Sequence, residues 1–462
     1  MKNKDIKHVY IIGIGGKGLN SIAEFCVSKG YKVSGSDIKE SPETKSLLQK
    51  GVQIYFDQTG KHIDSSIDLV IHSSIIKQIH SEIKRARHLQ ILVLSRAEFL
   101  GKLTDSYQRI SVAGSHGKST TSALATLALK SETGEVNAIT GAYIKELDSY
   151  QTSGHSHVCV LEACEYGKSF LHIPGDYTLI TSLEKSHMEY FKTEEKMNEA
   201  FKEFISTHKS NAVFIINGDI LKLKEICLMH PGKVITCGFN TANDYVIKNI
   251  KLQDNFSVFS IFKEEICIER DIQIKIPGTY NVLNVALVFA LLYEKRVGTS
   301  QFRKILNTFS GVGRRFEIEH HKSTIFVDDF AHHPTQVKNL FKSLKQFFPD
   351  KKIYAIFEPR QYHLIKTFLK EYGKSFNLAD EVCITDIVPA LGDTRRDVES
   401  LSTSDIIDSV QKYSRPQKVW YAQSYQEIVE KLNVKDLTDT VIATIGAGSI
   451  FKVRDLLVNR VQ

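Results

Sequence analysis

A loop near residue 115 carries residue types that bind phosphate. The stretch VAGSHGKSTTSAL, residues 112–124, places Gly114, Gly117, Lys118 and Ser119 between an apolar strand pattern and a helical pattern. Backbone N–H groups at a helix start and a lysine attract phosphate oxygens, and the serine is placed to ligate Mg²⁺. The longer phosphate loop has a further glycine where this chain has a valine. We predict a shortened ATP-binding loop that uses Mg²⁺; the alternative is a serine-rich helix cap with an incidental lysine.

A second glycine loop lies near the N-terminus. Gly13, Gly15 and Gly18 form the pattern G-x-G-x-x-G between a strand and a helix, and Asp37 ends the next predicted strand. This pattern binds a diphosphate at the helix start, and the acidic residue binds a ribose hydroxyl. A dinucleotide and a UDP-sugar both contain the diphosphate and the ribose that this pattern binds. The alternative is that the glycines bind no ligand and serve only close packing between helix and sheet. Two diphosphate sites favour an ATP-consuming enzyme with a second substrate.

The elements that position these loops alternate between strand and helix. The rhythm predicts an α/β fold of three domains, each with a mostly parallel sheet. We expect a Rossmann-like domain at 1–107, a central P-loop-type ATPase domain at 108–312 and a Rossmann-like C-terminal domain at 313–462. Residues 240–276 alternate apolar and polar types, which predicts a small antiparallel part, and 280–298 reads as a long apolar helix.

Composition restricts the class of protein. The chain has 462 residues, 42% of them hydrophobic, and a net charge of +7, which is mild for this length. Its seven cysteines include no C-x-x-C pair, which argues against a disulfide framework and a structural zinc. We expect a cytoplasmic monomer or homodimer that binds no nucleic acid and does not insert into a membrane. The basic stretch at 342–352 is interpreted as a solvated helix end with weak attraction for anions.

Several stretches in the same order resemble the Mur ligases. The loop GSHGKSTT is similar to their short GTHGKTT loop, and the histidine-containing loop and DDFAHHP are the most specific elements. The resemblance runs from about residue 8 to 455, and its other parts are GIGGKGLNSIAE (13–24), VSGSD (33–37), SRAEFLGKL (95–103), EACEYGKSFL (162–171), GVGRRFE (311–317) and VDDFAHHP (327–334).

The resemblance implies an ATP-dependent amide ligase of peptidoglycan synthesis. In the form closest to this chain, ATP phosphorylates the lactyl carboxylate of UDP-N-acetylmuramate, and L-alanine attacks the acyl phosphate. Lysine and Mg²⁺ suit the charge on a transferring phosphoryl group, and closure of the C-terminal domain would exclude water.

The family's motifs also imply roles for individual residues of this chain. Those implied for UDP-sugar binding are Gly13, Gly15, Gly16, Gly18, Asp37, Ser73 and Ser74. Those implied for ATP binding are Gly114, Ser115, His116, Gly117, Lys118, Ser119, Thr120, Asn281, Asn284, Asp328 and Asp329. The family positions that carry Mg²⁺ correspond to Ser119, Glu162 and His187. The implied catalytic set is Lys118, Glu162, His187, Arg314 and His333. His332 is implied, with His333, on the third domain's side of the site. Arg315 and Arg360 lie on the implied amino-acid side.

Some of these residues have simpler interpretations. Glu162 ends an apolar strand and could cap a neighbouring helix, and His187 could make an ordinary polar contact. His116 could be a loop residue that forms a hydrogen bond, and the pair Arg314 and Arg315 could be solvated at a domain hinge.

The chain departs from the family pattern at several positions. Ser182 and Ser186 replace an asparagine and an aspartate, and Tyr280 replaces a histidine. Arg360 replaces a histidine and Ser449 replaces an aspartate. Leu364 replaces an arginine that the family associates with the amino-acid carboxylate. The form FEPR is closer to the ligase that attaches recycled murein tripeptide. Three alternatives follow: that tripeptide ligase, an NAD-dependent oxidoreductase built on the first domain, and an inactive UDP-sugar binder.

Overall fold

The computed structural model describes residues 6–73, 76–253, 256–390, 393–432 and 437–461. Its contacts divide the chain into two compact units, each of which contains more than one segment of sequence. The first unit is Met1–Ser186, Glu195–Val246 and Leu283–Phe302; the second is His187–Glu194, Ile247–Val282 and Arg303–Gln462. No helix in the described ranges is long and apolar enough to cross a membrane.

The first unit begins with a parallel sheet whose order is β3-β2-β1-β4-β5. Its strands are β1 (His8–Ile12), β2 (Lys32–Ser36), β3 (Gln53–Tyr55), β4 (Leu69–His72) and β5 (Leu92–Ser95). Its helices are α1 (Lys17–Ser28), α2 (Pro42–Gln49), α3 (Ser81–His88) and α4 (Arg96–Leu103). Capping boxes at Ser41 and Ser95 fix the starts of α2 and α4. The order reverses between β1 and β4, and such a switch point is where ligands bind in open parallel sheets.

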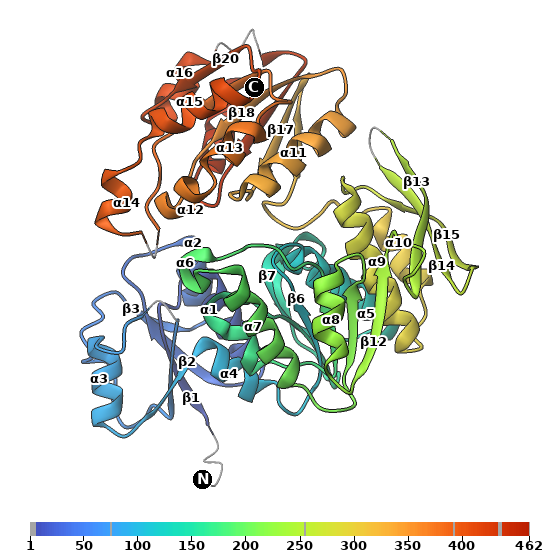
Figure 1. The fold of residues 1–462 in the computed structure, drawn as a ribbon. Coiled ribbons are helices and arrows are strands. Elements are labelled where there is room, and N and C mark those ends of the chain that lie inside the picture. Colours follow the sequence, from blue (N-terminus) through green and yellow to red (C-terminus); the bar gives the residue numbers. More distant parts are fainter. Residues whose placement is uncertain (1–5, 74–75, 254–255, 391–392, 433–436, 462) are drawn as a thin grey trace. The chain divides into compact units, whose positions relative to one another are not determined.

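A larger sheet follows, most of it in the same unit, with neighbours in the order β13-β12-β11-β10-β6-β9-β7-β8; β13 continues beyond Val246 into the second unit. Its strands are β6 (Gln108–Ala113), β7 (Asn137–Ile144), β8 (Ser149–Thr152), β9 (Val158–Glu162), β10 (Tyr177–Ile180), β11 (Val213–Asn217), β12 (Lys233–Gly238) and β13 (Tyr245–Leu252). The helical segments of this region are α5 (Lys118–Thr133), η1 (Lys145–Leu147), η2 (Tyr166–His172), α7 (Glu194–Ser206), α8 (Leu221–Leu228), α9 (Thr279–Glu294) and α10 (Ser300–Leu306). Helix α5 packs on β6, β7 and β9 (Figure 1).

The second unit contains the C-terminal sheet, whose order is β16-β17-β21-β18-β19-β20. Its strands are β16 (Glu317–His321), β17 (Thr324–Asp329), β18 (Lys352–Phe357), β19 (Glu381–Ile384), β20 (Lys418–Tyr421) and β21 (Thr440–Ile445). Its helices are α6 (Met188–Phe191), α11 (Pro334–Phe347), α12 (Tyr362–Thr367), α13 (Leu369–Ser375), α14 (Arg395–Glu399), α15 (Thr403–Tyr413), α16 (Tyr425–Lys431) and α17 (Phe451–Val461). The hairpin of β14 (Ser257–Lys263) and β15 (Ile266–Ile274) also belongs to this unit.

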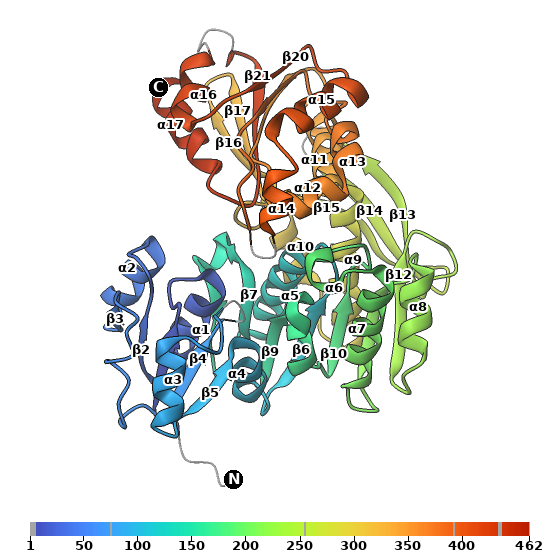
Figure 2. The same cartoon turned by 60° about the vertical axis from the view of Figure 1, so that its left-hand side comes forward.

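Alternating side chains give the C-terminal sheet a core on each face. Val327 and Phe357 pack with α11, α13 and α15, whereas their neighbours Phe326 and Ile356 pack with α16 and α17. Figure 2 shows the two sets of helices on opposite faces of this sheet. Sheets covered on both faces are typical of parallel α/β folds.

The predicted α/β fold with three domains and mostly parallel sheets is confirmed by these three layered sheets and by the structural comparison below. Helix α9 begins one residue before the predicted apolar segment and ends within it, and its residues from Val282 to Leu292 are buried. The expected antiparallel part is β14 paired with β15, whereas β13 pairs in parallel with β12.

Candidate functional site

Three neighbouring strands of the central sheet end at the predicted phosphate loop. Ala113 on β6 lies in register with Ile180 on β10, and Val112 lies in register with Glu162 on β9. The segments that follow these strands therefore meet at one edge of the sheet, although they are far apart in sequence. These segments are 114–118, 163–165 and 181–186.

Glycine is required at two positions of the loop. Gly114 has φ +129°, and a Cβ atom there would lie 2.3 Å from the Thr181 hydroxyl oxygen. Gly117 has φ +81° and caps α5, and its Cβ would lie 2.8 Å from the Asn284 side-chain oxygen. Larger residues would both strain the backbone and displace these neighbours. Asn284, implied for ATP binding, thus lies against the loop itself.

The segment after β10 holds the loop in place. The backbone N–H of His116 donates to the Ser182 hydroxyl at 2.8 Å, and the Ser115 hydroxyl donates to the Glu184 carbonyl at 2.7 Å. The Glu184 N–H donates back to the Ser115 hydroxyl at 2.9 Å. Ser182, one of the departures from the family pattern, is therefore part of the support for the loop.

Lys118 lies largely buried beneath the loop. Its ammonium donates to the carbonyl oxygens of Gly114 at 2.5 Å and Ser115 at 3.3 Å, and to a carboxylate oxygen of Glu165 at 2.8 Å. Burial is the largest single influence and favours the neutral amine, but the combined attraction of Glu165, Cys164 and Glu162 outweighs it and raises the pKa of Lys118. The lysine is thus held as a cation at the place where phosphate oxygens are expected.

Glu165 is a functional candidate that sequence reasoning missed. Its side chain is fully buried, and its second carboxylate oxygen accepts a hydrogen bond from the Ser186 hydroxyl at 3.1 Å. Ser186 replaces a family aspartate, yet Glu165 places a carboxylate beside this position. The available signal was a second acidic residue three positions after Glu162, in the stretch EACEYG.

The residues at this edge fit a hard cation. Ser119 lies at the start of α5, and Glu162 ends β9 with one carboxylate oxygen accepting the Gly141 N–H at 2.9 Å. A Cβ at Gly141 would lie only 2.3 Å from that oxygen, so glycine lets the backbone approach the carboxylate. Hydroxyl and carboxylate oxygens suit Mg²⁺. His187, the third implied ligand, precedes α6 with φ +53°.

The N-terminal glycine loop is braced by Asp37. One carboxylate oxygen accepts the Gly15 N–H at 2.8 Å, and the other accepts the Ile38 N–H at 2.7 Å. Gly13 adopts φ +81°, and the Gly16 N–H donates to the Gly13 carbonyl at 3.0 Å. Asp37 therefore orders the loop, in addition to the ribose contact that its position implies.

Arg96 packs against the last glycine of this loop. Its Nε donates to the Gly18 carbonyl at 3.0 Å, and a Cβ at Gly18 would lie 2.9 Å from the same nitrogen. Ser73 follows β4, and its carbonyl oxygen lies 2.8 Å from His72 Nδ1. Ser74 lies outside the described residues.

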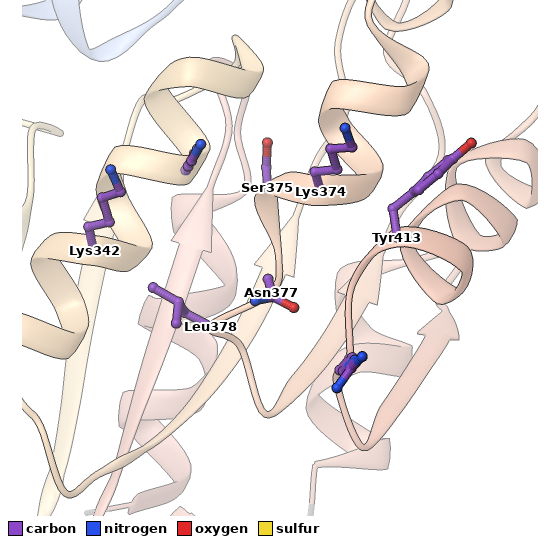
Figure 3. A pocket seen from close by; sticks show the side chains of 8 residues that line it. Lys342, Lys374, Ser375, Asn377, Leu378 and Tyr413 are labelled. Carbon is purple, nitrogen blue, oxygen red and sulfur yellow. The ribbon is translucent and has the colours of Figure 1, made fainter.

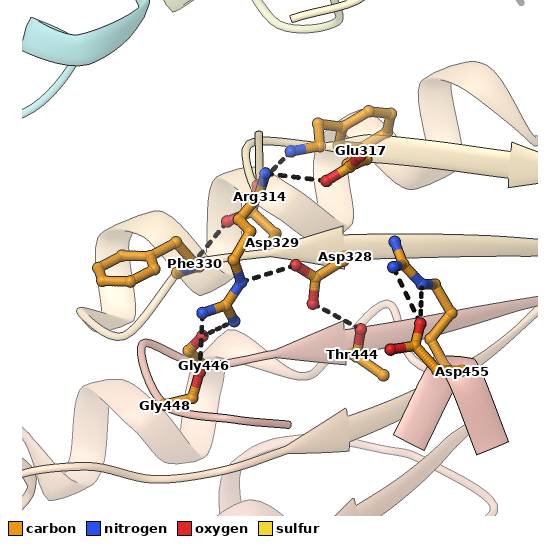
Figure 4. A network of polar contacts seen from close by, with 12 residues as sticks. Arg314, Glu317, Asp328, Asp329, Phe330, Thr444, Gly446, Gly448 and Asp455 are labelled. Atoms are coloured by element: carbon orange, nitrogen blue, oxygen red, sulfur yellow. Dashed lines mark hydrogen bonds and ion pairs between the residues drawn. The ribbon is translucent and has the colours of Figure 1, made fainter. Parts of the chain in front are cut away.

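The C-terminal unit holds Arg314 in a network of contacts (Figure 4). Its guanidinium donates to Asp328 at 2.9 Å and to the carbonyls of Gly448 and Gly446, both at 2.7 Å. Asp328 also accepts the Thr444 hydroxyl at 2.7 Å. Arg314 thus ties the turn before β16 to β17 and to the loop after β21. In this arrangement its side chain has a structural role beside the implied catalytic one.

Asp329 organises the same turn from the end of β17. Its two carboxylate oxygens accept the N–H groups of Phe316 and Ala331, both at 2.7 Å. Burial raises the pKa of this carboxyl, although Arg315 opposes the shift. The Arg315 guanidinium lies 5.0 Å from the centre of the Phe330 ring. The structure therefore brings Arg314, Arg315, Asp328 and Asp329 together.

The remaining predicted residues have local positions in the second unit. His333 caps α11, with Nδ1 accepting the Thr335 N–H at 3.3 Å, and His332 Nδ1 lies 3.1 Å from the Phe330 carbonyl oxygen. Asn281 donates to the Pro277 carbonyl at 2.7 Å.

Three departures from the family pattern have distinct surroundings. Arg360 forms a backbone bridge with Val388 and is partly exposed. Leu364 is buried in the second unit, so it packs where the family's arginine would carry charge. The Ser449 hydroxyl lies 2.8 Å from the Tyr425 hydroxyl.

Comparison with known proteins covers nearly the whole chain. The Mur ligase family catalytic domain matches residues 8–108, the Mur ligase middle domain 112–292, and the Mur ligase glutamate ligase domain 314–448. A UDP-N-acetylmuramate--L-alanine ligase of Alkaliphilus metalliredigens is 32% identical over 99% of this chain and 98% of its own length. The enzyme of the same name from Agathobacter rectalis is 30% identical over 97% of each chain.

Solved structures share the fold. The UDP-N-acetylmuramate-alanine ligase of Thermotoga maritima gives a TM-score of 0.82 at 24% identity, covering 98% of each chain. A murein peptide ligase of Psychrobacter arcticus gives 0.72 at 20% identity, also over 98% of each chain. With full-length relatives at 30% identity and above, matching domain models and the phosphate loop described above, this chain belongs to the Mur ligase family.

Proposed function

We propose that this enzyme joins L-alanine to UDP-N-acetylmuramate in an ATP-dependent reaction of peptidoglycan synthesis. The observation that carries the proposal is the loop 114–119, in which a buried, charged Lys118 lies under backbone N–H groups at a helix start. The two substrates are taken from the names of the full-length relatives, which are UDP-N-acetylmuramate--L-alanine ligases. Family membership favours a ligase over the oxidoreductase built on the first domain. A cytoplasmic location and a monomeric or dimeric state stay predictions.

The chemistry has two steps. A carboxylate oxygen of the lactyl group attacks the γ-phosphorus of ATP, which gives an acyl phosphate and ADP. The amine of L-alanine then attacks the acyl carbon, loses a proton, and expels inorganic phosphate as the amide forms. Negative charge on the transferring group is greatest in the first step, where a fixed cation lowers the barrier most.

The residues of this chain have separate tasks in that scheme. Lys118 would turn from the Gly114 and Ser115 carbonyls to phosphate oxygens, and Glu165 would keep it charged. Ser119, Glu162 and His187 would hold Mg²⁺, which would neutralise phosphate charge when bound. The glycine loop at 13–18 would hold the diphosphate of the UDP-sugar. Arg315 and Arg360 would contribute to the amino-acid side.

An acceptor panel tests the proposal. Purified protein is given ATP, Mg²⁺ and UDP-N-acetylmuramate with L-alanine, L-serine, glycine or L-Ala-γ-D-Glu-meso-diaminopimelate, and phosphate release is followed. We expect release with L-alanine. Release only with the tripeptide would assign the recycling reaction instead, and no release with any acceptor while the UDP-sugar still binds would leave a binding protein.

A substitution tests the role given to the loop. We expect Lys118→Ala to abolish turnover, because it removes the fixed cation, while affinity for the UDP-sugar stays near that of the wild type. Lys130→Ala, near the other end of α5, is the matched control and should keep its turnover. Wild-type turnover in Lys118→Ala would contradict the assignment of the loop to ATP.

A further inference from the structure

The C-terminal unit carries a basic pocket for which neither the proposed reaction nor the family resemblance gives a use (Figure 3). Its volume is about 590 Å³, within the usual range for small-molecule sites. Four cations line it: Lys338 and Lys342 from α11, Lys374 from α13, and Arg415 beyond α15. Within the described chain, no carboxylate is among the lining residues.

The cations of this pocket are not neutralised by the protein. Among the described residues, none of Lys338, Lys342, Lys374 and Arg415 forms an ion pair. Asp380 follows the lining residue Leu378 by two positions, but its carboxylate already accepts the Ile353 N–H at 2.8 Å. The same carboxylate lies 3.6 Å from the ammonium of Lys345, which does not line the pocket. All four side chains are exposed, so water and salt screen part of their mutual repulsion, and a multiply charged anion bound among them would relieve the rest.

Buried hydroxyls hold the walls of the pocket together. The Ser375 hydroxyl of α13 donates to the Pro334 carbonyl of α11 at 3.0 Å. Ser409 and Ser414 donate to the Leu369 and Gly373 carbonyls, at 2.8 Å and 2.6 Å, and so join α15 to α13. A Cβ at Gly373 would lie 2.3 Å from the Ser409 hydroxyl oxygen, so these two helices pack closely. The lysines thus project from a fixed frame.

Two lysines of the pocket, Lys338 and Lys342, lie along α11 beyond His333, which is among the residues implied for catalysis. Helix α11 starts after its cap, His333, and rises about 1.5 Å per residue. Lys338 and Lys342 therefore lie roughly 8 and 14 Å along the helix from His333.

We propose that this pocket binds an oligophosphate, that is, a diphosphate or triphosphate group, either inorganic or on a nucleotide. Several lysine ammonium groups suit a compact ligand with several charges, whereas a single carboxylate would leave most of them unpaired. The ammonium groups of Lys370, Lys374 and Lys412 lie 5.3 to 6.0 Å from the centre of the Tyr413 ring, so a nucleic-acid base stacking there would compete with these cations.

Calorimetric titration with inorganic triphosphate and no Mg²⁺ tests the proposal, in a Lys118→Ala background that removes the lysine of the ATP loop. We expect saturable binding that weakens with added NaCl and falls at least tenfold in Lys338→Gln/Lys342→Gln/Lys374→Gln. The control is Lys84→Gln/Lys202→Gln/Lys452→Gln, which removes the same charge from exposed helix positions and should leave binding unchanged.

Parallel titrations with ATP and with inorganic triphosphate distinguish a nucleotide ligand from a free phosphate chain. Equal binding of ATP and inorganic triphosphate would mean that the phosphates alone are recognised, and tighter binding of ATP would assign a nucleotide. Unchanged affinity in the pocket variant would overturn the proposal. So would an absence of saturable binding, or binding of RNA or anionic vesicles through these lysines without binding of triphosphate. When Lys118 is left intact, the pocket variant should keep wild-type ligase turnover, which separates this result from a failure of the proposed function.

Discussion

At the scale of single residues, the pair of Lys118 and Glu165 carries the candidate site. The lysine was predicted from its position in the loop, but its partner lies 47 positions later in the chain. The two meet because β6 and β9 are neighbours in the sheet, and strand order is not chain order. Glu162 was predicted because it matches a family position that carries Mg²⁺, whereas no local signal in the sequence placed Glu165 under the lysine.

Replacing Glu165 should therefore affect both stability and turnover. Glu165→Gln leaves the buried Lys118 without its counter-charge, and removal of one partner of a buried ion pair costs about 3 to 5 kcal/mol. We expect a lower melting temperature and a loss of ATP-dependent turnover. Glu203→Gln is the control, since its ion pair with Lys168 is exposed and should contribute less than about 1 kcal/mol. Equal behaviour of the two variants would argue against the pair.

At the scale of elements, His208 joins the end of α7 to the central sheet. Its Nδ1 lies 2.8 Å from the Phe204 carbonyl oxygen, and its Nε2 lies 2.8 Å from the Thr178 hydroxyl of β10. Burial lowers the pKa of this histidine to about 4. The unfolded chain takes up a proton near its ordinary pKa of 6.5, whereas the folded chain does so only near 4.

The stability that His208 contributes should be present above pH 6.5 and be lost as the pH falls towards 4. The loss amounts to about 3 kcal/mol at most, from the difference between the two pKa values. Hydrogen exchange of the β10 amides should show less loss of protection on acidification in His208→Gln than in the wild type. His88→Gln, at an exposed position, should follow the wild type. Identical pH profiles for all three proteins would contradict this origin of acid sensitivity.

Arg314 connects two strands and a loop of the C-terminal sheet. Arg314→Lys keeps the charge but cannot reproduce three directed hydrogen bonds, so we expect a loss of about 2 to 4 kcal/mol in the free energy of unfolding. Trp420 on β20 is the protein's single tryptophan, and its fluorescence during denaturation reports on this sheet. Arg395→Lys, 92% exposed, is the control. If the denaturation midpoint of Arg314→Lys equalled that of the wild type, the network would contribute little to the free energy of unfolding.

At the scale of the whole molecule, the alternation of apolar strands and helices was sufficient to predict the α/β class and the three sheets. The position of Arg314 was predicted, but its three-way contact was not, because its partners at 446 and 448 lie at the other end of the C-terminal sequence. Likewise, the stretch 342–352, which contains Lys342 of α11, was interpreted as a solvated helix end. Only the packing of α13 and α15 gathers them with Lys374 and Arg415 into a pocket.

In the reaction we propose, the lactyl carboxylate is activated as an acyl phosphate before L-alanine attacks. UDP-N-acetylmuramate labelled with ¹⁸O in that carboxylate, incubated with ATP, Mg²⁺ and L-alanine, tests it directly by mass spectrometry of both products. We expect the UDP-N-acetylmuramoyl-L-alanine amide and the transfer of one labelled oxygen to inorganic phosphate for each amide formed. Phosphate released without label, or no amide with L-alanine, would contradict it.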